Sequence, residues 1–167
     1  MIGDRWGVTA AETMLPFPCD GFVEGPTLQA WRGVTVAARP EIVWGRVRQL
    51  RLAPYSYDLL DNLGHRSPRD RRDLPDPVAG EAFSRAFGRD QGKVVDVDPG
   101  RHLTAHIMSS YLSYVIRPRG PQTRLLLKVV ADLPRWPAQA LCIGDLLMAR
   151  RQLLRLAALA AQDERET

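Results

Sequence analysis

The sequence predicts an α+β fold, in which strands and helices occupy separate stretches of the chain. Residues 28–38 read LQAWRGVTVAA, an alternating pattern with β-branched residues that is typical of a strand. A helix is expected from Pro40 to Leu50, because proline suits the first turn and the apolar side chains share one face. A long helix over about 137–162 is expected to close the chain.

The stretch between these helices predicts antiparallel strands, because Gly and Pro residues divide it into pieces too close for parallel crossovers. The expected strands are 81–87, 93–98, 102–108, 111–117 and 123–132. Before them, residues 55–63 are expected to form a second short helix or tight turn. Residues 65–77 are rich in Arg, Asp and Pro and predict a solvated loop.

A chain of 167 residues suits one domain, since that length buries roughly 70% of the surface that the unfolded chain exposes. Residues 1–27 contain several Pro and Gly residues without sustained periodicity, so we expect an irregular arm lying over the domain. The single domain is expected over 28–162, followed by a frayed tail at 163–167.

The charges permit binding to anions without requiring it, because 23 basic against 19 acidic residues give a net charge of +4. Only Lys93 and Lys128 are lysines, which leaves 21 arginines spread along the chain. This preference for arginine is better explained by the codon usage of a GC-rich bacterial source than by a phosphate-binding stripe. The composition is close to average globular usage, which excludes disordered and fibrous proteins.

The expected location is the cytoplasm. Cys19 and Cys142 lie far apart and have no further ligand at metal-binding spacing, so neither a disulfide framework nor a zinc site is indicated. The first fourteen residues carry charges and no apolar run, unlike a secretory signal. The most apolar segment, 141–161, is interrupted by Asp and Arg, so no membrane insertion is expected.

Two segments carry a resemblance to a known family. They read WGRVRQLRLAPYSYDLLDNLGHRSPR from Trp44 and GDLLMARRQLLRLAALA from Gly144. Together with the order of elements, they resemble the START-like superfamily, whose members are also called polyketide cyclase/dehydrase-like or SRPBCC proteins. Within it, the chain looks like a mainly actinobacterial branch. The resemblance covers about residues 15–162, and no reaction is attached to these motifs.

The resemblance implies a helix-grip fold: a curved antiparallel sheet wrapped around the long C-terminal helix, with two short helices after the first strand. It also implies a cavity between sheet and helix for a mostly apolar ligand, since known members bind lipids, sterols, hormones or aromatic polyketides. The residues give six strands where the fold implies seven. Either the seventh lies in residues 70–80, or the sheet is shorter there.

Arg150 is a candidate for the polar anchor of the interior. At about 100° per residue it falls beside an apolar face of the final helix. That face consists of Leu146, Leu153, Ala157 and Ala160. A buried guanidinium needs a partner, so Arg150 would pair with Asp58 or Asp61, meet the polar end of a ligand, or extend past the helix edge.

A second set of candidates lies in the segment expected to cap the cavity mouth. It consists of Tyr55, Tyr57, Asp58, Asp61 and Asn62. Tyrosine hydroxyls and a carboxylate there would orient a ligand or transfer protons. The alternative is that Asp58 or Asn62 caps a local turn and that Tyr55 seals the core.

The strand at 102–108 places His102, Thr104 and His106 on one face. Two histidines at this spacing lack a third close ligand, so no metal is expected. His106 is a candidate general base if it faces a cavity, and otherwise an ordinary exposed or core histidine. No serine or cysteine lies in a nucleophile motif, and no glycine-rich phosphate loop occurs, so no cofactor is expected.

Three functions follow from these observations. The first is binding of a small hydrophobic or aromatic molecule in an apolar pocket of a few hundred Å³. Small residues of the last helix leave room for it: Gly144, Ala149, Ala157 and Ala160. The alternative is a cyclase or dehydratase, in which Tyr55, Asp58, His106 or Arg150 would move protons. A third is a partner-binding role of the surface. Nucleic acid is not an expected partner, because aspartates intersperse the Arg-rich loop at 66–72. An oligomer stays possible.

Overall fold

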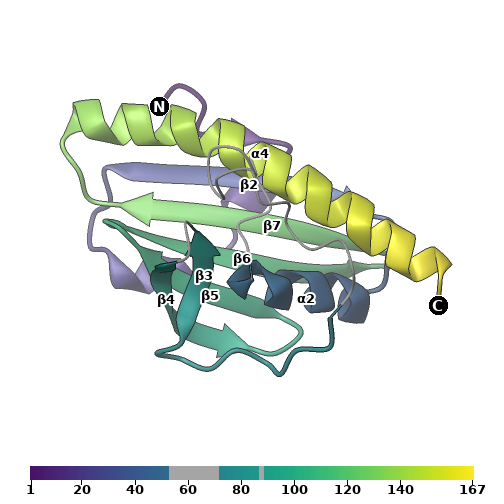
Figure 1. The fold of residues 1–167 in the computed structure, drawn as a ribbon. Helices are drawn as coiled ribbons and strands as arrows, with labels where there is room; N and C mark the ends of the chain where they lie inside the picture. Colours follow the sequence, from purple (N-terminus) through teal and green to yellow (C-terminus); the bar gives the residue numbers. More distant parts are fainter. Residues whose placement is uncertain (53–71, 87–88) are drawn as a thin grey trace.

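The computed structural model describes residues 1–52, 72–86 and 89–167 (Figure 1). Seven strands form one sheet in the order β1-β2-β7-β6-β5-β4-β3. Their bounds are Arg5–Trp6 (β1), Leu28–Val36 (β2), Ala82–Ala86 (β3), Arg89–Asp98 (β4), His102–Ile107 (β5), Ser110–Arg119 (β6) and Gln122–Ala131 (β7). The helices are Ala10–Thr13 (α1), Pro18–Phe22 (η1), Pro40–Arg48 (α2), Gln49–Arg51 (η2) and Arg135–Arg165 (α4). The expected α+β helix-grip fold is confirmed.

The pairing is antiparallel throughout except at one edge, where β1 runs parallel to β2. This two-residue strand is the seventh one, and residues 72–80 contain none. The backbone N–H of Trp31 on β2 donates to the Asp4 carbonyl at 2.7 Å, which joins the N-terminal residues to the free edge of the sheet. A strand this short leaves no periodicity in the sequence, so its position was missed.

The fourth strand begins at Arg89, earlier than the expected start at residue 93. The sequence GRDQG suggested an interruption, but Gly92 lies within β4 and has φ near +65°. An added Cβ at Gly92 would lie 2.5 Å from the His106 carbonyl oxygen, so the neighbouring strand approaches too closely for another residue. Gly92 therefore allows β4 to continue through a position at which the sequence predicted an interruption.

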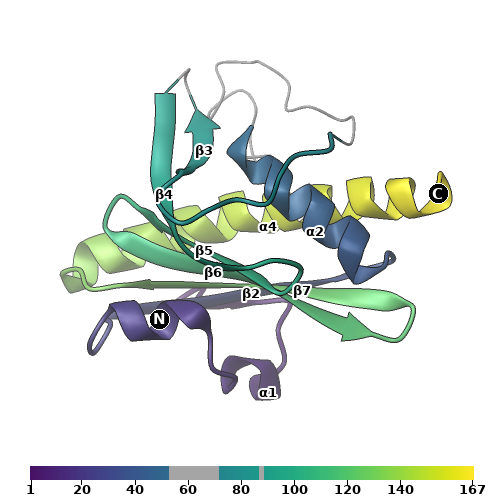
Figure 2. The same ribbon diagram turned by 90° about the horizontal axis from the view of Figure 1, so that it is seen from below.

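The sheet carries different layers on its two faces (Figure 2). We call the face beneath α2 and α4 the inner face, and the opposite one the outer face. On β7, Leu125, Leu127 and Val129 belong to the inner core, whereas Leu126 and Val130 pack with Phe17 and other residues of the N-terminal segment. We call residues 1–27 the N-terminal segment; its residues 8–23 thus lie over the outer face, whereas residues 1–6 run along the β2 edge beside α4.

Helix α4 lies across the inner face and makes its main contacts with β2 and with α2 (Figure 1). It extends to Arg165, past the expected end at residue 162, and Asp163 is 7% exposed. Residues 163–167 were expected to form a frayed tail, but the first of them, Asp163, is buried because it forms an ion pair with Arg46 of α2. The expected second short helix at 55–63 lies outside the described residues.

Candidate ligand-binding site

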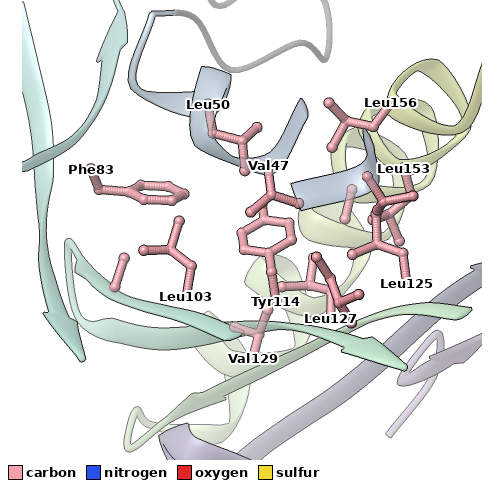
Figure 3. Packing of buried hydrophobic residues seen from close by; sticks show 14 of the residues in the cluster. Val47, Leu50, Phe83, Leu103, Tyr114, Leu125, Leu127, Val129, Leu153 and Leu156 are labelled. Atoms are coloured by element: carbon pink, nitrogen blue, oxygen red, sulfur yellow. The ribbon is translucent and has the colours of Figure 1, made fainter. Parts of the chain in front are cut away.

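The inner face holds a group of buried side chains that come from strands β3, β5 and β6 and from α2 and η2 (Figure 3). We call this group the Tyr114 cluster. It consists of Val47, Leu50, Phe83, Leu103 and Tyr114. The rings of Phe83 and Tyr114 lie 6.2 Å apart at 26°, an offset stack. The cluster forms an aromatic and aliphatic part of the hydrophobic core at this end of the inner face.

One hydrogen bond supplies a polar group within these apolar surroundings. The Tyr114 hydroxyl donates to the Gln152 side-chain oxygen at 2.5 Å, and both residues are buried. Burial raises the pKa of Tyr114 well above its usual range, the charge of Asp145 adds to this, and the bond to Gln152 opposes it. The phenol therefore stays neutral and acts as a hydrogen-bonding group instead of a base.

Local sequence explains why these two side chains meet. On β6, alternation places Leu112, Tyr114 and Ile116 on the inner face. On α4, Gln152 lies three residues after Ala149 and four before Leu156, so it belongs to the buried face of the helix. Sequence reasoning missed both residues. The sequence does contain a signal for both residues, because each is a polar residue at a position where the spacing of apolar residues predicts a buried side chain.

A buried arginine lies farther along the inner face. Arg32 of β2 is 0% exposed and donates to the carbonyls of Asp4 at 2.9 Å, Trp31 at 3.0 Å and Cys142 at 3.3 Å. Its Nη2 lies 3.0 Å from the Asp145 Oδ2, close enough for an ion pair but without the alignment of a hydrogen bond. Burial raises the pKa of Asp145 to about 6, although Arg32 opposes this.

A second buried arginine joins the two inner-face helices. Arg46 of α2 donates through Nε and Nη2 to the two carboxylate oxygens of Asp163, both at 2.6 Å. Its Nη1 also donates to the Gln49 side-chain oxygen at 3.2 Å. This two-pronged geometry is the strongest that an arginine and a carboxylate can form. The pair fixes α2 against the end of α4.

Arg150 does not face the interior, so that prediction is wrong. Its side chain is exposed, and the guanidinium carbon lies 5.5 Å from the centre of the Trp6 ring. The buried face of α4 is centred on Ala149, Leu153 and Leu156, which turns the neighbouring Arg150 away from the sheet. The argument that a buried arginine needs a carboxylate applies instead to Arg32 and Arg46.

His106 lies on the outer face, so the hypothesis that it faces a cavity beneath α4 is wrong. It is half-buried, and its ring lies 4.5 Å from Tyr111, which stacks on Phe22 of the N-terminal segment at 4.9 Å. It borders a surface hollow of about 450 Å³ together with Lys93 and other residues of the β3–β5 edge. The histidines share this face as expected, and His102 bonds Asp96 at 2.8 Å.

The other candidates cannot be placed. Tyr55, Tyr57, Asp58, Asp61 and Asn62 lie outside the described residues. Within residues 1–52, 72–86 and 89–167, no three His, Cys, Asp or Glu side chains are grouped as a metal ion would need. In the same ranges no helix is long and apolar enough to cross a membrane.

Comparison with known proteins shows the fold. No protein-family model matches the chain, and neither does any curated protein. A crystal structure of a Rhodobacter sphaeroides protein is 16% identical, with a TM-score of 0.57 over 84% of this chain and 97% of that one. A Mycobacterium smegmatis protein is 15% identical, with a TM-score of 0.55 over 82% of this chain and 93% of that one.

A Rhizobium etli protein described as AHSA1-like is also similar. It is 16% identical, with a TM-score of 0.48 over 80% of this chain and 82% of that one. The Rhodobacter and Mycobacterium structures agree with the helix-grip fold that the sequence motifs implied. Membership of the START-like superfamily stays a prediction from those motifs.

Proposed function

We propose that the protein binds a small hydrophobic or aromatic molecule against the Tyr114 cluster, between the sheet and the helices of the inner face. The observation that carries the proposal is the Tyr114–Gln152 hydrogen bond, a neutral hydroxyl and amide set among apolar side chains. A few well-placed polar groups within an apolar lining are typical of small-molecule sites. We place this activity in the cytoplasm of a bacterium.

The side chains of the cluster specify the chemistry of the ligand. Phe83 and Tyr114 carry rings and Leu50 and Leu103 are aliphatic, and all four are buried against one another, so a ligand would have to enter between them; flat or branched apolar ligands would gain most from that burial. The phenol and the amide would bind one neutral polar group, such as a hydroxyl or a carbonyl. An anionic group would instead meet the repulsion of Asp145, which acts on Tyr114.

The experiment uses 2-naphthol as the probe, a flat aromatic molecule with one hydroxyl. Titration calorimetry on the wild type should show saturable binding. Tyr114→Phe should weaken it about fivefold, because one net hydrogen bond is worth about 1 kcal/mol. Tyr111→Phe is the matched control, since that tyrosine lies on the outer face and its loss should leave the affinity unchanged.

Two outcomes would contradict the proposal. One is the absence of saturable binding by the wild type. The other is an equal response of the two tyrosine variants, which would place the probe elsewhere. Thermal melts of both variants confirm that each remains folded, so that a lost affinity is not mistaken for unfolding.

The cyclase or dehydratase alternative gains no support from the described residues. His106 lies on the outer face and Arg150 is exposed, so neither meets the Tyr114 cluster. Tyr114 itself is held neutral by burial, which does not suit a proton acceptor. Tyr55 and Asp58 lie outside the described part of the chain.

A further inference from the structure

Helix α4 carries large apolar side chains on the face that points away from the sheet. Trp136 is 85% exposed and Leu147 is 57% exposed, and Ile143 and Leu154 are also exposed. At about 100° per residue these four side chains fall within an arc of about 40°. The buried side chains of the helix, such as Ala149 and Leu156, lie on the opposite side. The helix therefore has a second apolar face without a partner in the described part of the chain.

The N-terminus extends this surface. The backbone N–H of Ile2 donates to the Gln139 side-chain oxygen at 3.2 Å, and the Gln139 amide donates to the Ile2 carbonyl at 2.8 Å. These bonds hold Ile2, itself mostly exposed, beside the first turns of α4. We call Ile2, Trp136, Ile143, Leu147 and Leu154 the α4 stripe. Figure 1 shows α4 forming one border of the molecule, with the N-terminus next to its first turns.

The α4 stripe is long enough to contact an extended flat surface and is longer than a small ligand would need. From Trp136 to Leu154 the helix rises about 27 Å at 1.5 Å per residue. A row of large exposed apolar side chains along one helix face marks a contact with a partner or a membrane. Tryptophan at one end is typical of side chains that sit at the boundary between lipid and water.

Charge decides between the possible occupants. Arg135 and Arg150 are exposed on the same helix, and the single acidic residue between positions 135 and 162 is Asp145. Asp145 lies toward the sheet, where it is paired with Arg32. The surface around the stripe is thus basic, and an antiparallel pairing of two α4 helices about Leu147 would bring arginines together without a carboxylate between them.

We propose that the α4 stripe binds the surface of an anionic lipid membrane. The apolar side chains would enter the boundary between head groups and acyl chains, as those of interfacial helices do, while the arginines attract the negative lipids. The helix would lie on the membrane without crossing it. This surface is separate from the Tyr114 cluster, so the inference does not depend on the proposed function.

The experiment is co-sedimentation of the purified protein with vesicles at low salt. Vesicles of phosphatidylcholine with 30% phosphatidylglycerol should bind the protein, and vesicles of pure phosphatidylcholine should bind it much more weakly. Leu147→Gln should lower the partition coefficient about tenfold, because one buried leucine contributes about 1.5 kcal/mol. Arg150→Gln should lower it about fivefold on the anionic vesicles only.

Met108→Gln is the matched control, because Met108 is equally apolar and exposed but lies in the turn between β5 and β6. It should bind like the wild type. Binding should also shift the tryptophan emission to shorter wavelength, and Trp136→Leu should remove most of this shift. The other three tryptophans are half-buried or buried, so Trp136 reports the contact.

Three results would overturn the proposal. The first is no co-sedimentation with anionic vesicles. The second is an equal loss of binding in Leu147→Gln and Met108→Gln, which would exclude α4 as the contact. The third is a wild-type dimer in size-exclusion chromatography with light scattering that Leu147→Gln converts to a monomer, which would show that a second copy covers the stripe.

Discussion

Three buried cations each have their own carboxylate in this structure. Arg32 is paired with Asp145, Arg46 with Asp163, and Lys128 with Asp20. Lys128 also lies 4.9 Å from the ring of Trp31 and 5.6 Å from the ring of Phe17. Because a desolvated charge is costly when its partner is removed, a single substitution in the Arg46–Asp163 pair, where both groups are buried, should be severe.

The Arg46–Asp163 pair gives the sharpest contrast with a surface pair. Asp163→Asn removes the charge opposite a guanidinium that is 2% exposed, and we expect a loss of about 3–5 kcal/mol in the free energy of unfolding. Glu164→Gln is the matched control, because it removes the exposed pair with Arg39 and should cost less than about 1 kcal/mol. Urea unfolding of both variants measures the difference, and equal losses would contradict the prediction.

Asp145 should make stability depend on pH. Its pKa is about 6 in the folded protein and near 3.8 in the unfolded chain, because burial disfavours the charged form. The folded state therefore holds the extra proton, and the resulting stability is fully present below about pH 4 and is lost as the pH rises through 6. Glu12 acts in the opposite direction, since Arg124 lowers its pKa to about 2 and its contribution is lost only in stronger acid.

Asp145→Asn tests this assignment, because the variant cannot titrate. The decline in the wild-type free energy of unfolding between pH 4 and pH 6.5, up to about 3 kcal/mol, should be absent from the variant. Urea unfolding at four pH values in this window measures both slopes. A slope that survives in Asp145→Asn would assign the dependence to another group.

The N-terminal segment is the element whose attachment depends most on close backbone contact. Gly7 has φ near +67°, and a Cβ there would collide with the Gly33 carbonyl oxygen of β2. The segment is further held by Arg124 of β7, whose Nε donates to Glu12 at 2.6 Å. Glu12 also accepts from the Thr9 backbone at 2.8 Å and so caps α1. Turn, cap and ion pair together fix the segment on the outer face.

Gly7→Ala should therefore cost more than its backbone conformation alone requires. Gly25 has a similar φ near +62° but open space around it, so Gly25→Ala should cost about 1 kcal/mol. Gly7→Ala should cost at least about 2 kcal/mol more, and limited proteolysis should release residues 1–27 faster. If the two alanine variants unfold alike, the contact with Gly33 is not what holds the segment.

At the scale of the whole molecule, the net charge of +4 is spread over arginines that often have partners. Arg85 is paired with Asp90, Arg101 with Asp98, and Arg124 with Glu12. Neutralised arginines attract phosphate weakly. The absence of a nucleic-acid partner stays a prediction, since the Arg-rich loop at 66–72 is largely outside the described residues.

Fluorescence polarisation with a labelled DNA duplex tests this prediction. We expect weak binding that falls steeply as salt rises, because only non-specific phosphate contacts are available. The same measurement with single-stranded RNA serves as the comparison. Tight, sequence-selective binding at physiological salt would show that the loop was misinterpreted.

Periodicity in the sequence determined the elements and their order. The strand at 28–38, the helix at 40–50 and the long final helix were predicted within a few residues, because alternation and helical spacing are local properties. The same local reasoning placed Thr104 and His106 on one face of their strand. It did not predict on which side of the sheet that face would lie. For α4 it misplaced the centre of the buried face by about 50° around the helix axis, which moved Arg150 to the inside.

Tertiary structure decided which charges are buried and which residues meet. Arg46 and Asp163 are far apart in sequence, and nothing near either residue predicts the other; they pair because α2 and the end of α4 cover the same inner face. The two-residue β1 exists only because β2 has a free edge to pair with. His106 faces outward because the N-terminal segment, and not α4, covers its side of the sheet. These features depend on packing between distant segments, and local spacing carries no information about them.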